Sequence, residues 1–539
     1  MFARAERRTL NAGGALALGG VLLFVGAATA VLLAHAGGGA APLLDAYIAR
    51  VARFTLVQAA LSTLLSVALA IPVARALCRQ RTFPGRVWIL RLSVVPLGLP
   101  ALVAALGVIE IWGRQGVVND LLRLAGLQNP VSVYGLAGIL IAHVFFNMPL
   151  AARFLLAALD RIPPEYWLSS ANLGMGNGAV FRLIEWPVMR RVLPGIAGLV
   201  FMLCATSFTI VLTLGGGPAA TTIEVAIYQA LRFDFDPERA VLLAFLQIAV
   251  TAALLWLVSL FGRPPEEGIT VGRAVRRFDG RRRRLADGLV ILAFTLFTAA
   301  PLAATLVSGL AADFGRLALD PLLHRALATS LAISLASASL SLLVALPIVL
   351  VPRLAESGDA GAATRLMGRA LPAVGSLILL VPPVVVATGW FLMLRTFGET
   401  GRFAPAVITV INALMALPFV VRVLEPAYRT HLSRTARLAL SLGVTGRRRL
   451  QWIDWPALKK PFLTAFAFAM ALSLGDLGAV AIFGAEGFVT LPWLLFSRMA
   501  SYRTADAAGI ALILGVLCLL LTLPSTATDR TTERPGPDA

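Results

Sequence analysis

LGMGNGAVFRLIEWPVMRR, at residues 173–191, is followed 269 positions later by the similar stretch LGVTGRRRLQWIDWPALKK, at residues 442–460. Both stretches contain a glycine, nine further residues, an isoleucine, an acidic residue, a tryptophan and a proline. The same offset carries Pro149 onto Pro418, Gly215 onto Gly484 and Thr221 onto Thr490. A gapless match of this extent predicts an internal repeat, in which each half of the chain forms a similar lobe.

Composition places both halves in a membrane. Hydrophobic residues make up 58% of the 539 residues and charged residues only 14%, whereas roughly a quarter of the residues of a soluble domain are charged. Several apolar runs exceed the roughly 20 residues that a membrane-spanning helix needs. We therefore predict an all-α polytopic membrane protein with about twelve transmembrane helices in two parallel-repeat halves. The expected spans lie near 13–35, 56–77, 92–112, 133–157, 193–214, 239–261, 286–310, 326–351, 371–394, 404–420, 462–483 and 507–524.

Basic residues predict the orientation of these spans. Most of the 47 lysines and arginines fall on alternate loops and the adjoining span ends, as the positive-inside rule requires if both termini are cytoplasmic. The first apolar run, which begins near Gly13, is longer than the apolar core of a signal peptide, so we expect an uncleaved span rather than a secretory signal. The run Arg281 to Arg284 could contact nucleic acid, but a basic loop between spans is usually only a topology signal. We expect a multi-pass protein of the bacterial inner membrane without a nucleic-acid partner.

The chain divides by composition into six segments. Residues 263–285 contain two adjacent prolines and the arginine run, and lack an apolar stretch of membrane length. We expect the following organisation: 1–50, first span and outer loop; 51–262, first lobe; 263–285, cytoplasmic linker; 286–322, seventh span and outer loop; 323–525, second lobe; 526–539, polar tail.

The repeated stretch predicts a hairpin after the fourth span of each half. Residues 168–173 and 437–442 are compatible with a helix, and Gly174 or Gly443 then allows the chain to leave that helix through a left-handed conformation. A second short helix follows, and Pro187 and Pro456 are expected to prevent it from running straight into the next span. Taken singly, each hairpin could simply be a capped surface turn. Two copies at matching spacing favour a shared function.

These hairpins resemble the docking loop of ABC importer permeases of type I, whose usual pattern is Glu-Ala-Ala, three residues, Gly, nine residues, Ile, any residue and Leu-Pro. The sequence departs from that pattern, because Leu168, Ser169 and Ser170 or Arg437, Leu438 and Ala439 occupy the Glu-Ala-Ala positions, and a tryptophan replaces the leucine. The resemblance implies that the hairpins are coupling helices seated on a separate ATPase subunit. The docking residues implied are Ser170, Ala171, Gly174, Ile184, Trp186, Pro187, Ala439, Leu440, Gly443, Ile453, Trp455 and Pro456.

The ATPase has to be a partner. A phosphate-binding P-loop ends in Gly-Lys-Ser/Thr, but the only lysines, Lys459 and Lys460, stand in Leu-Lys-Lys-Pro. We expect an ABC ATPase subunit in two copies, with ATP and magnesium used there and no cofactor bound by this chain. Scattered histidines, and cysteines without metal-ligand spacing, also argue against an enzyme or a metal site.

Three longer strings resemble the thiamine and thiamine-pyrophosphate permeases: YGLAGILIAHVFFNMPLAARFLL from Tyr134, LGGGPAATTIEVAIYQAL from Leu214 and SLGDLGAVAIFG from Ser473. This resemblance implies that the cargo is thiamine, with its phosphates, and that a periplasmic thiamine-binding protein docks on the outer loops 215–238 and 484–506. Alternatives are a ferric-iron or other small-solute ABC permease, an ion-coupled secondary transporter of similar hydropathy and a structural membrane protein.

Polar residues inside the spans are candidates for the translocation path, since they are costly in lipid and usually face a cavity or a partner. They are His143, Asn147, Ser207, Asn412 and Asp476. Interhelical hydrogen bonding is the alternative for His143 and Asn147. For Asp476 the alternatives are contact with a cationic cargo and a structural or gating role.

Overall fold

The computed structural model describes residues 4–35, 45–126, 132–260, 280–356, 361–398, 400–444, 446–484 and 488–526. Within these ranges every regular element is a helix, which confirms the predicted all-α class. Eleven of the described helical segments are long and apolar enough to cross a membrane. Most of the expected linker (263–279) and the tail from 527 onward lie outside the described residues.

The third span of each half is a broken helix. In the first half the residues after the break still belong to one of the eleven long segments, Ala101–Leu124, whereas in the second half none of the eleven covers the third span. The expected span 371–394 is divided between α17 (Ala362–Leu380) and α18 (Pro383–Thr396), with Pro382 at the break. In the first half, Pro100 separates α4 (Val95–Gly98) from α5 (Ala101–Trp112). Proline lacks the backbone N–H and disfavours helical geometry in the preceding residue, so each span stops there and restarts.

Two compact units contain the described helices, and both are discontinuous in sequence. Unit 2 comprises residues 42–226 and 249–312, and its centre is formed by α2, α7 and α10, which pack against one another. Helix α14 packs against α2 and α5 of the same unit, and Ser308 of α14 donates a hydrogen bond to Glu110 of α5. The helices named are α2 (Ala46–Arg79), α7 (Leu136–Asp160), α10 (Trp186–Ala205) and α14 (Arg281–Leu310).

Unit 1 comprises residues 1–41, 227–248 and 313–539, and has the equivalent centre of α16, α19 and α21. Helix α1 packs against α16 and α18, where the Phe24 ring stacks on Trp390 at 4.7 Å between ring centroids. Helix α1 begins the first half of the sequence but belongs to unit 1, with the central helices of the second half. Helix α14 begins the second half but belongs to unit 2, with the central helices of the first half. The helices named are α1 (Arg4–His35), α16 (Pro321–Ala355), α19 (Thr400–Ser441) and α21 (Trp455–Leu474).

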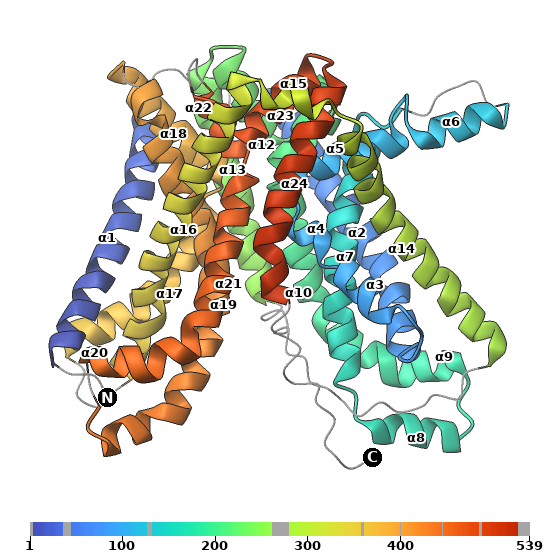
Figure 1. Ribbon diagram of the computed structural model, residues 1–539, viewed down its shortest axis with the longest axis horizontal. Coiled ribbons are helices and arrows are strands. Elements are labelled where there is room, and N and C mark those ends of the chain that lie inside the picture. Colours follow the sequence, from blue (N-terminus) through green and yellow to red (C-terminus); the bar gives the residue numbers. More distant parts are fainter. Residues whose placement is uncertain are drawn as a thin grey trace. The chain divides into compact units, whose positions relative to one another are not determined.

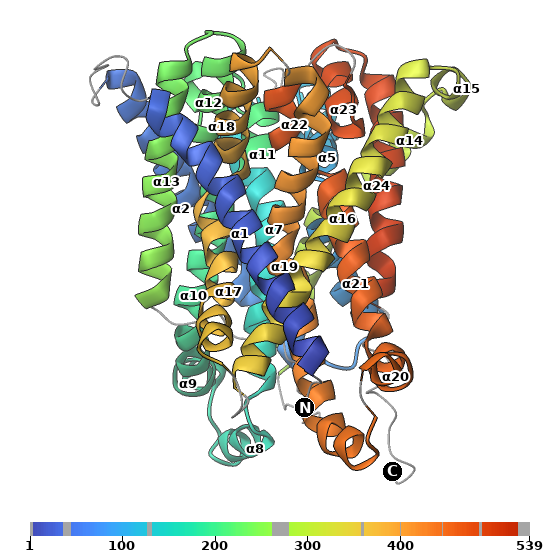
Figure 2. The same ribbon diagram turned by 90° about the vertical axis from the view of Figure 1, so that its left-hand side faces the viewer.

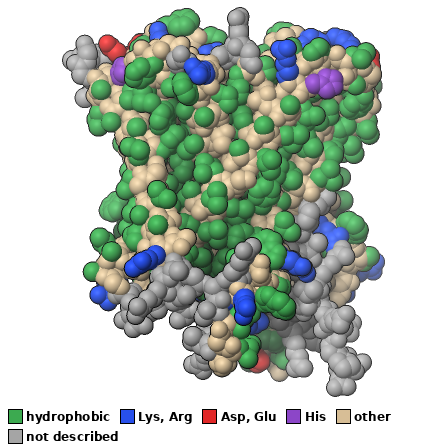
Figure 3. Space-filling view, turned by 60° about the vertical axis from the view of Figure 1, so that its left-hand side comes forward, with side chains coloured by type: hydrophobic (Ala, Val, Ile, Leu, Met, Phe, Trp, Pro, Cys, Tyr) green, Lys and Arg blue, Asp and Glu red, His purple; other side chains and the backbone are tan. Residues whose placement is uncertain are grey.

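Small buried residues allow the central helices to approach closely. The buried positions of α2 include Ala59, Ser62, Ala70 and Ala74, and close packing through small residues is how helices associate in lipid. Large apolar side chains such as Leu16 and Leu64 point outward. Figure 3 shows such apolar side chains over the middle of one face, with lysine and arginine side chains towards its ends.

The short helices lie at the ends of the units. Figure 1 shows α8 (Pro164–Asn172) and α9 (Asn177–Val180) at the end of unit 2 opposite α6 (Val117–Leu124). Figure 2 shows α20 (Gly446–Arg449) at the end of unit 1 opposite α15 (Phe314–Ala318) and α23 (Leu491–Ala500). The remaining α-helices are α3 (Arg86–Leu92), α11 (Phe208–Leu214), α12 (Ile223–Arg232), α13 (Pro237–Leu260), α22 (Gly478–Phe483) and α24 (Thr504–Thr526), and a 3-10 helix, η2, spans Pro218–Ala220.

Candidate functional site

The two hairpins have the same turn. We call residues 164–186 the first hairpin and residues 433–455 the second hairpin. Gly174 has φ +62° and Gly443 has φ +63°, which confirms the predicted left-handed conformation. The Met175 N–H donates to the Ser170 carbonyl at 2.9 Å, and the Val444 N–H donates to the Ala439 carbonyl at 3.0 Å. These bonds close a glycine-terminated Schellman cap on each first helix.

The first helices of the two hairpins differ in how they begin. In the first hairpin, α8 starts at Pro164 after α7 has ended at Asp160. In the second, α19 continues as one helix of 42 residues to Ser441. The helix of the expected span 404–420 therefore does not end at 420 but continues into the second hairpin.

A π-helical turn precedes the tryptophan and proline in both copies. It spans Phe181–Glu185 (η1) and Leu450–Asp454 (η3), again 269 residues apart. The expectation that Pro187 interrupts the second helix is wrong, because α9, η1 and α10 follow one another without a break, and α20, η3 and α21 do the same around Pro456. The proline ring would clash with the carbonyl four residues earlier, and the wider π turn accommodates it.

Large apolar side chains are exposed at equivalent positions of the two hairpins. Leu173 and Leu442 follow the first helix, at 76% and 64% exposure, while Leu183 and Trp452 lie on the π turns at 63% and 80%. Because they are exposed at equivalent positions of both copies, these side chains are candidates for an interaction surface that the two hairpins share.

The predicted docking residues fall into two sets. Those that shape the hairpin are buried or form the turn, and those that could meet a partner are exposed. In the first set Ser170 and Ala439 are buried, Ile184 and Ile453 are half-buried, and Gly174 and Gly443 form the turn. The exposed residues of the second set are Ala171, Trp186, Trp455 and Pro456. Pro187 is half-buried. The side chain of Leu440 lies outside the described residues.

Three of the predicted path residues form hydrogen bonds with a neighbouring helix of their own unit. His143 Nδ1 lies 2.9 Å from Ser62 Oγ, and Asn147 donates to Cys204 Sγ at 3.3 Å. Asn412 donates to Ser473 Oγ at 2.9 Å. Such bonds between helices satisfy polar groups that lipid would leave unpaired.

Asp476 lies at the break between α21 and α22. Its carboxylate accepts hydrogen bonds from the Gly478 N–H at 3.2 Å and the Ala479 N–H at 3.4 Å. Ser207, its counterpart in the repeat, occupies the N-cap of α11 but makes no capping bond there. The carboxylate thus satisfies backbone donors where the helix restarts.

The five predicted path residues are divided between the two units. His143, Asn147 and Ser207 belong to unit 2, whereas Asn412 and Asp476 belong to unit 1. Among the described residues, no group of histidine, cysteine and acidic side chains is arranged to hold a metal.

Curated relatives match nearly the whole chain. The thiamine transport system permease protein ThiP of Brucella abortus is 52% identical over 96% of this chain and 95% of its own length. The protein of the same name in Escherichia coli K12 is 44% identical over 88% of each chain. A shorter similarity, 31% identity over 36% of this chain and 73% of the relative, links it to the molybdenum transport system permease protein ModB of Mycobacterium bovis. No family model matches the chain.

Proposed function

We propose, from the premise that this chain belongs to the family of thiamine transport system permease proteins, that it carries thiamine and its phosphates across the inner membrane as the permease subunit of an ATP-driven importer. One observation carries this proposal: two hairpins of the same geometry stand on a chain that is similar to these permeases over nearly its full length. A transporter driven by an ion gradient has no need of such a matched pair.

The hairpins are the docking sites for two copies of an ABC ATPase subunit in this proposal. Leu173 and Leu183 of the first hairpin, and Leu442 and Trp452 of the second, offer each copy an apolar contact. ATP and magnesium are used in the ATPase, and this chain contributes movement rather than catalysis. The lobes 51–262 and 323–525 carry one docking site each.

The orientation of the chain in this proposal is based on the placement of the basic residues. Both termini and both hairpins face the cytoplasm, and a periplasmic thiamine-binding protein docks on the outer loops 215–238 and 484–506. Membrane lipid surrounds the apolar faces. Ser207, Asn412 and Asp476, together with His143 and Asn147, are proposed to border the path that opens between conformations.

Co-purification tests the docking step. The chain is expressed with an ABC ATPase subunit and isolated in detergent, and the expected result is a complex that contains two ATPase copies per permease. A single cysteine that replaces Trp452 should then form a crosslink to the ATPase, whereas a cysteine at Trp88, which is exposed on α3 outside the hairpins, should not. A permease that transports without any ATPase would contradict the proposal and favour a secondary transporter.

A further inference from the structure

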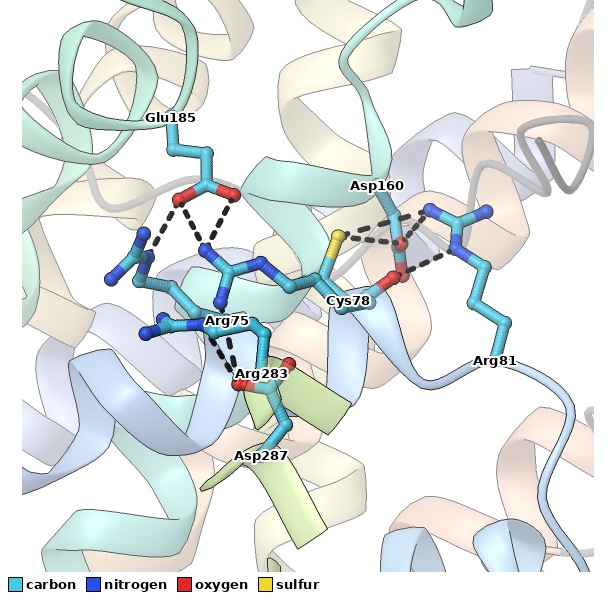
Figure 4. A network of polar contacts seen from close by, with 8 residues as sticks. Arg75, Cys78, Arg81, Asp160, Glu185, Arg283 and Asp287 are labelled. Atoms are coloured by element: carbon cyan, nitrogen blue, oxygen red, sulfur yellow. Dashed lines mark hydrogen bonds and ion pairs between the residues drawn. The ribbon is translucent and has the colours of Figure 1, made fainter. Parts of the chain in front are cut away.

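A buried network of ion pairs joins the first hairpin to the transmembrane helices of unit 2 (Figure 4). Glu185 ends the π turn of this hairpin, and only 1% of its side chain is exposed. Its carboxylate accepts a hydrogen bond from Arg75 Nε at 2.6 Å and from Arg79 Nη2 at 3.3 Å. The Arg75 guanidinium also lies 4.1 Å from the centre of the Phe181 ring, at the start of the same π turn. Both arginines belong to α2, so the hairpin is held to the end of that helix.

The network continues into α14. Arg79 Nη1 lies 3.3 Å from Asp287 Oδ1, and Arg283 Nε lies 3.5 Å from the same oxygen. Figure 4 shows Glu185 and Asp287 on opposite sides of the arginine side chains. The side chain of Asp287 is 5% exposed. Three elements that are distant in sequence therefore share one set of paired charges.

Burial makes these pairs hard to separate. Taking one partner away from a buried ion pair leaves an uncompensated charge in a poor solvent, which is much less favourable than breaking a pair in water. A movement of the first hairpin away from α2 would have to leave Glu185 and Arg75 without their partners, while Arg79 would keep Asp287. The hairpin and the two helices are therefore expected to move together.

The second hairpin is attached differently. Asp454 is the repeat counterpart of Glu185, and it accepts from His431 Nε2 at 2.7 Å and lies 3.4 Å from Arg449 Nε. His431 belongs to α19, and Arg449 to α20 of the hairpin itself. In α16, which occupies the place of α2 in unit 1, Arg353 pairs with Glu425 of α19 instead. These contacts of Asp454 connect the second hairpin to α19.

We propose that Glu185 is a positioning residue that makes the first hairpin move as one body with α2 and α14, while Asp454 ties the second hairpin to α19. The two hairpins then pass the movement of the ATPase to different sets of helices. This inference rests on the proposed docking of the ATPase on both hairpins. It means that the two lobes respond differently to the ATPase, although the repeated stretch has an acidic residue at the same place in both.

Distance measurements by pulsed electron paramagnetic resonance test the inference in the assembled complex. Spin labels are placed at Tyr166→Cys on α8 and Leu289→Cys on α14, both exposed, after replacement of the three native cysteines. With the network intact, the distance between the labels should be the same in the nucleotide-free and ATP-trapped complexes. In the double variant Arg75→Met/Glu185→Leu the distance should shift on ATP binding, and the ratio of thiamine imported to ATP hydrolysed should fall. This variant removes a buried pair as a unit, which proteins often tolerate, and it leaves Arg79 paired with Asp287.

Control variants separate this effect from general damage. Asp454→Asn should leave the distance between α8 and α14 unchanged, and so should Asp120→Asn, an exposed carboxylate on α6. A distance that changes with nucleotide in the complex with the intact network would overturn the inference even if the double variant did not fold. A double variant with an unchanged distance and import ratio would overturn it as well. A complex that never binds ATPase would instead contradict the proposed function.

Discussion

Gly174 and Gly443 have nearly the same backbone conformation, with φ of +62° and +63°, although 269 residues separate them. Nothing lies within 4 Å of the position that a Cβ would take at either glycine. A side chain at either position would therefore not be crowded by neighbouring atoms. The requirement for glycine comes instead from the left-handed backbone, which costs a residue with a side chain roughly 1–2 kcal/mol.

Replacing Gly174 or Gly443 by valine should therefore open the turn and uncouple ATP hydrolysis from uptake, while membrane insertion stays normal. Asparagine tolerates the left-handed conformation better, so Gly174→Asn should retain more coupling than Gly174→Val. Gly178 lies in the same hairpin, in open space and without positive φ, and Gly178→Val provides the matched control. The measurement is thiamine uptake per ATP hydrolysed, and normal values in both valine variants would contradict this role.

Arg448 and Arg449 should affect the second hairpin in different ways. The sequence suggests that the run Arg447 to Arg449 makes the assembly of this hairpin with the ATPase sensitive to salt, because the equivalent residues 178–180 are neutral. In the structure Arg449 is buried against Asp454, whereas Arg448 is exposed. Arg448→Ala should reduce the salt dependence of ATPase binding, and Arg449→Ala should lower the stability of the permease. Salt titration of the purified complex measures the effect of Arg448→Ala, and thermal unfolding of the permease measures the effect of Arg449→Ala. If Arg448→Ala and the unaltered protein bind the ATPase with the same salt dependence, the role proposed for Arg448 is wrong.

Asp476 should act through its shape as a cap. Asparagine has one acceptor oxygen and can keep one of the two bonds, whereas alanine loses both; loss of such a cap costs about 0.5–2 kcal/mol. Asp476→Asn should therefore retain more thiamine uptake than Asp476→Ala, and both variants should hydrolyse ATP at the basal rate. If the asparagine and alanine variants lose uptake equally while basal hydrolysis is unaffected, the charge itself selects a cationic cargo.

The Asn412 to Ser473 hydrogen bond should contribute to stability and not to cargo recognition. Interhelical hydrogen bonds of this kind are worth about 0.6 kcal/mol on average in a membrane protein. A double-mutant cycle with Asn412→Ala and Ser473→Ala should give a coupling free energy of unfolding near that value. The KM for thiamine should stay unchanged in the single variants, because Asn412 is proposed to border the path without contacting the cargo; a large increase in KM would show a direct contact.

The repeat predicts the hairpins well because their geometry is local. A glycine at a helix end and a proline at a fixed distance act on backbone within a few residues, so the cap at Gly174 follows from the sequence. The π turn does not follow, since its sequence is compatible with an ordinary helix. Pro187 is accommodated by that wider turn.

The partners of Glu185 could not be predicted from the sequence. The pattern marks an acidic residue at this position and at Asp454, but Arg75 and Asp287 are each about a hundred residues away from Glu185. Which charges meet it depends on the packing of α2, α10 and α14 within unit 2. The same holds for the placement of α1 and α14, because hydropathy locates a span and says nothing of its neighbours.

Uptake into proteoliposomes tests the central claim most directly. The permease, reconstituted with its ATPase subunit and with a thiamine-loaded binding protein outside, should accumulate labelled thiamine only when ATP and magnesium are supplied on the side of the hairpins. Accumulation driven by an ion gradient without ATP, or ATP-driven accumulation of ferric iron with no uptake of thiamine, would contradict the account.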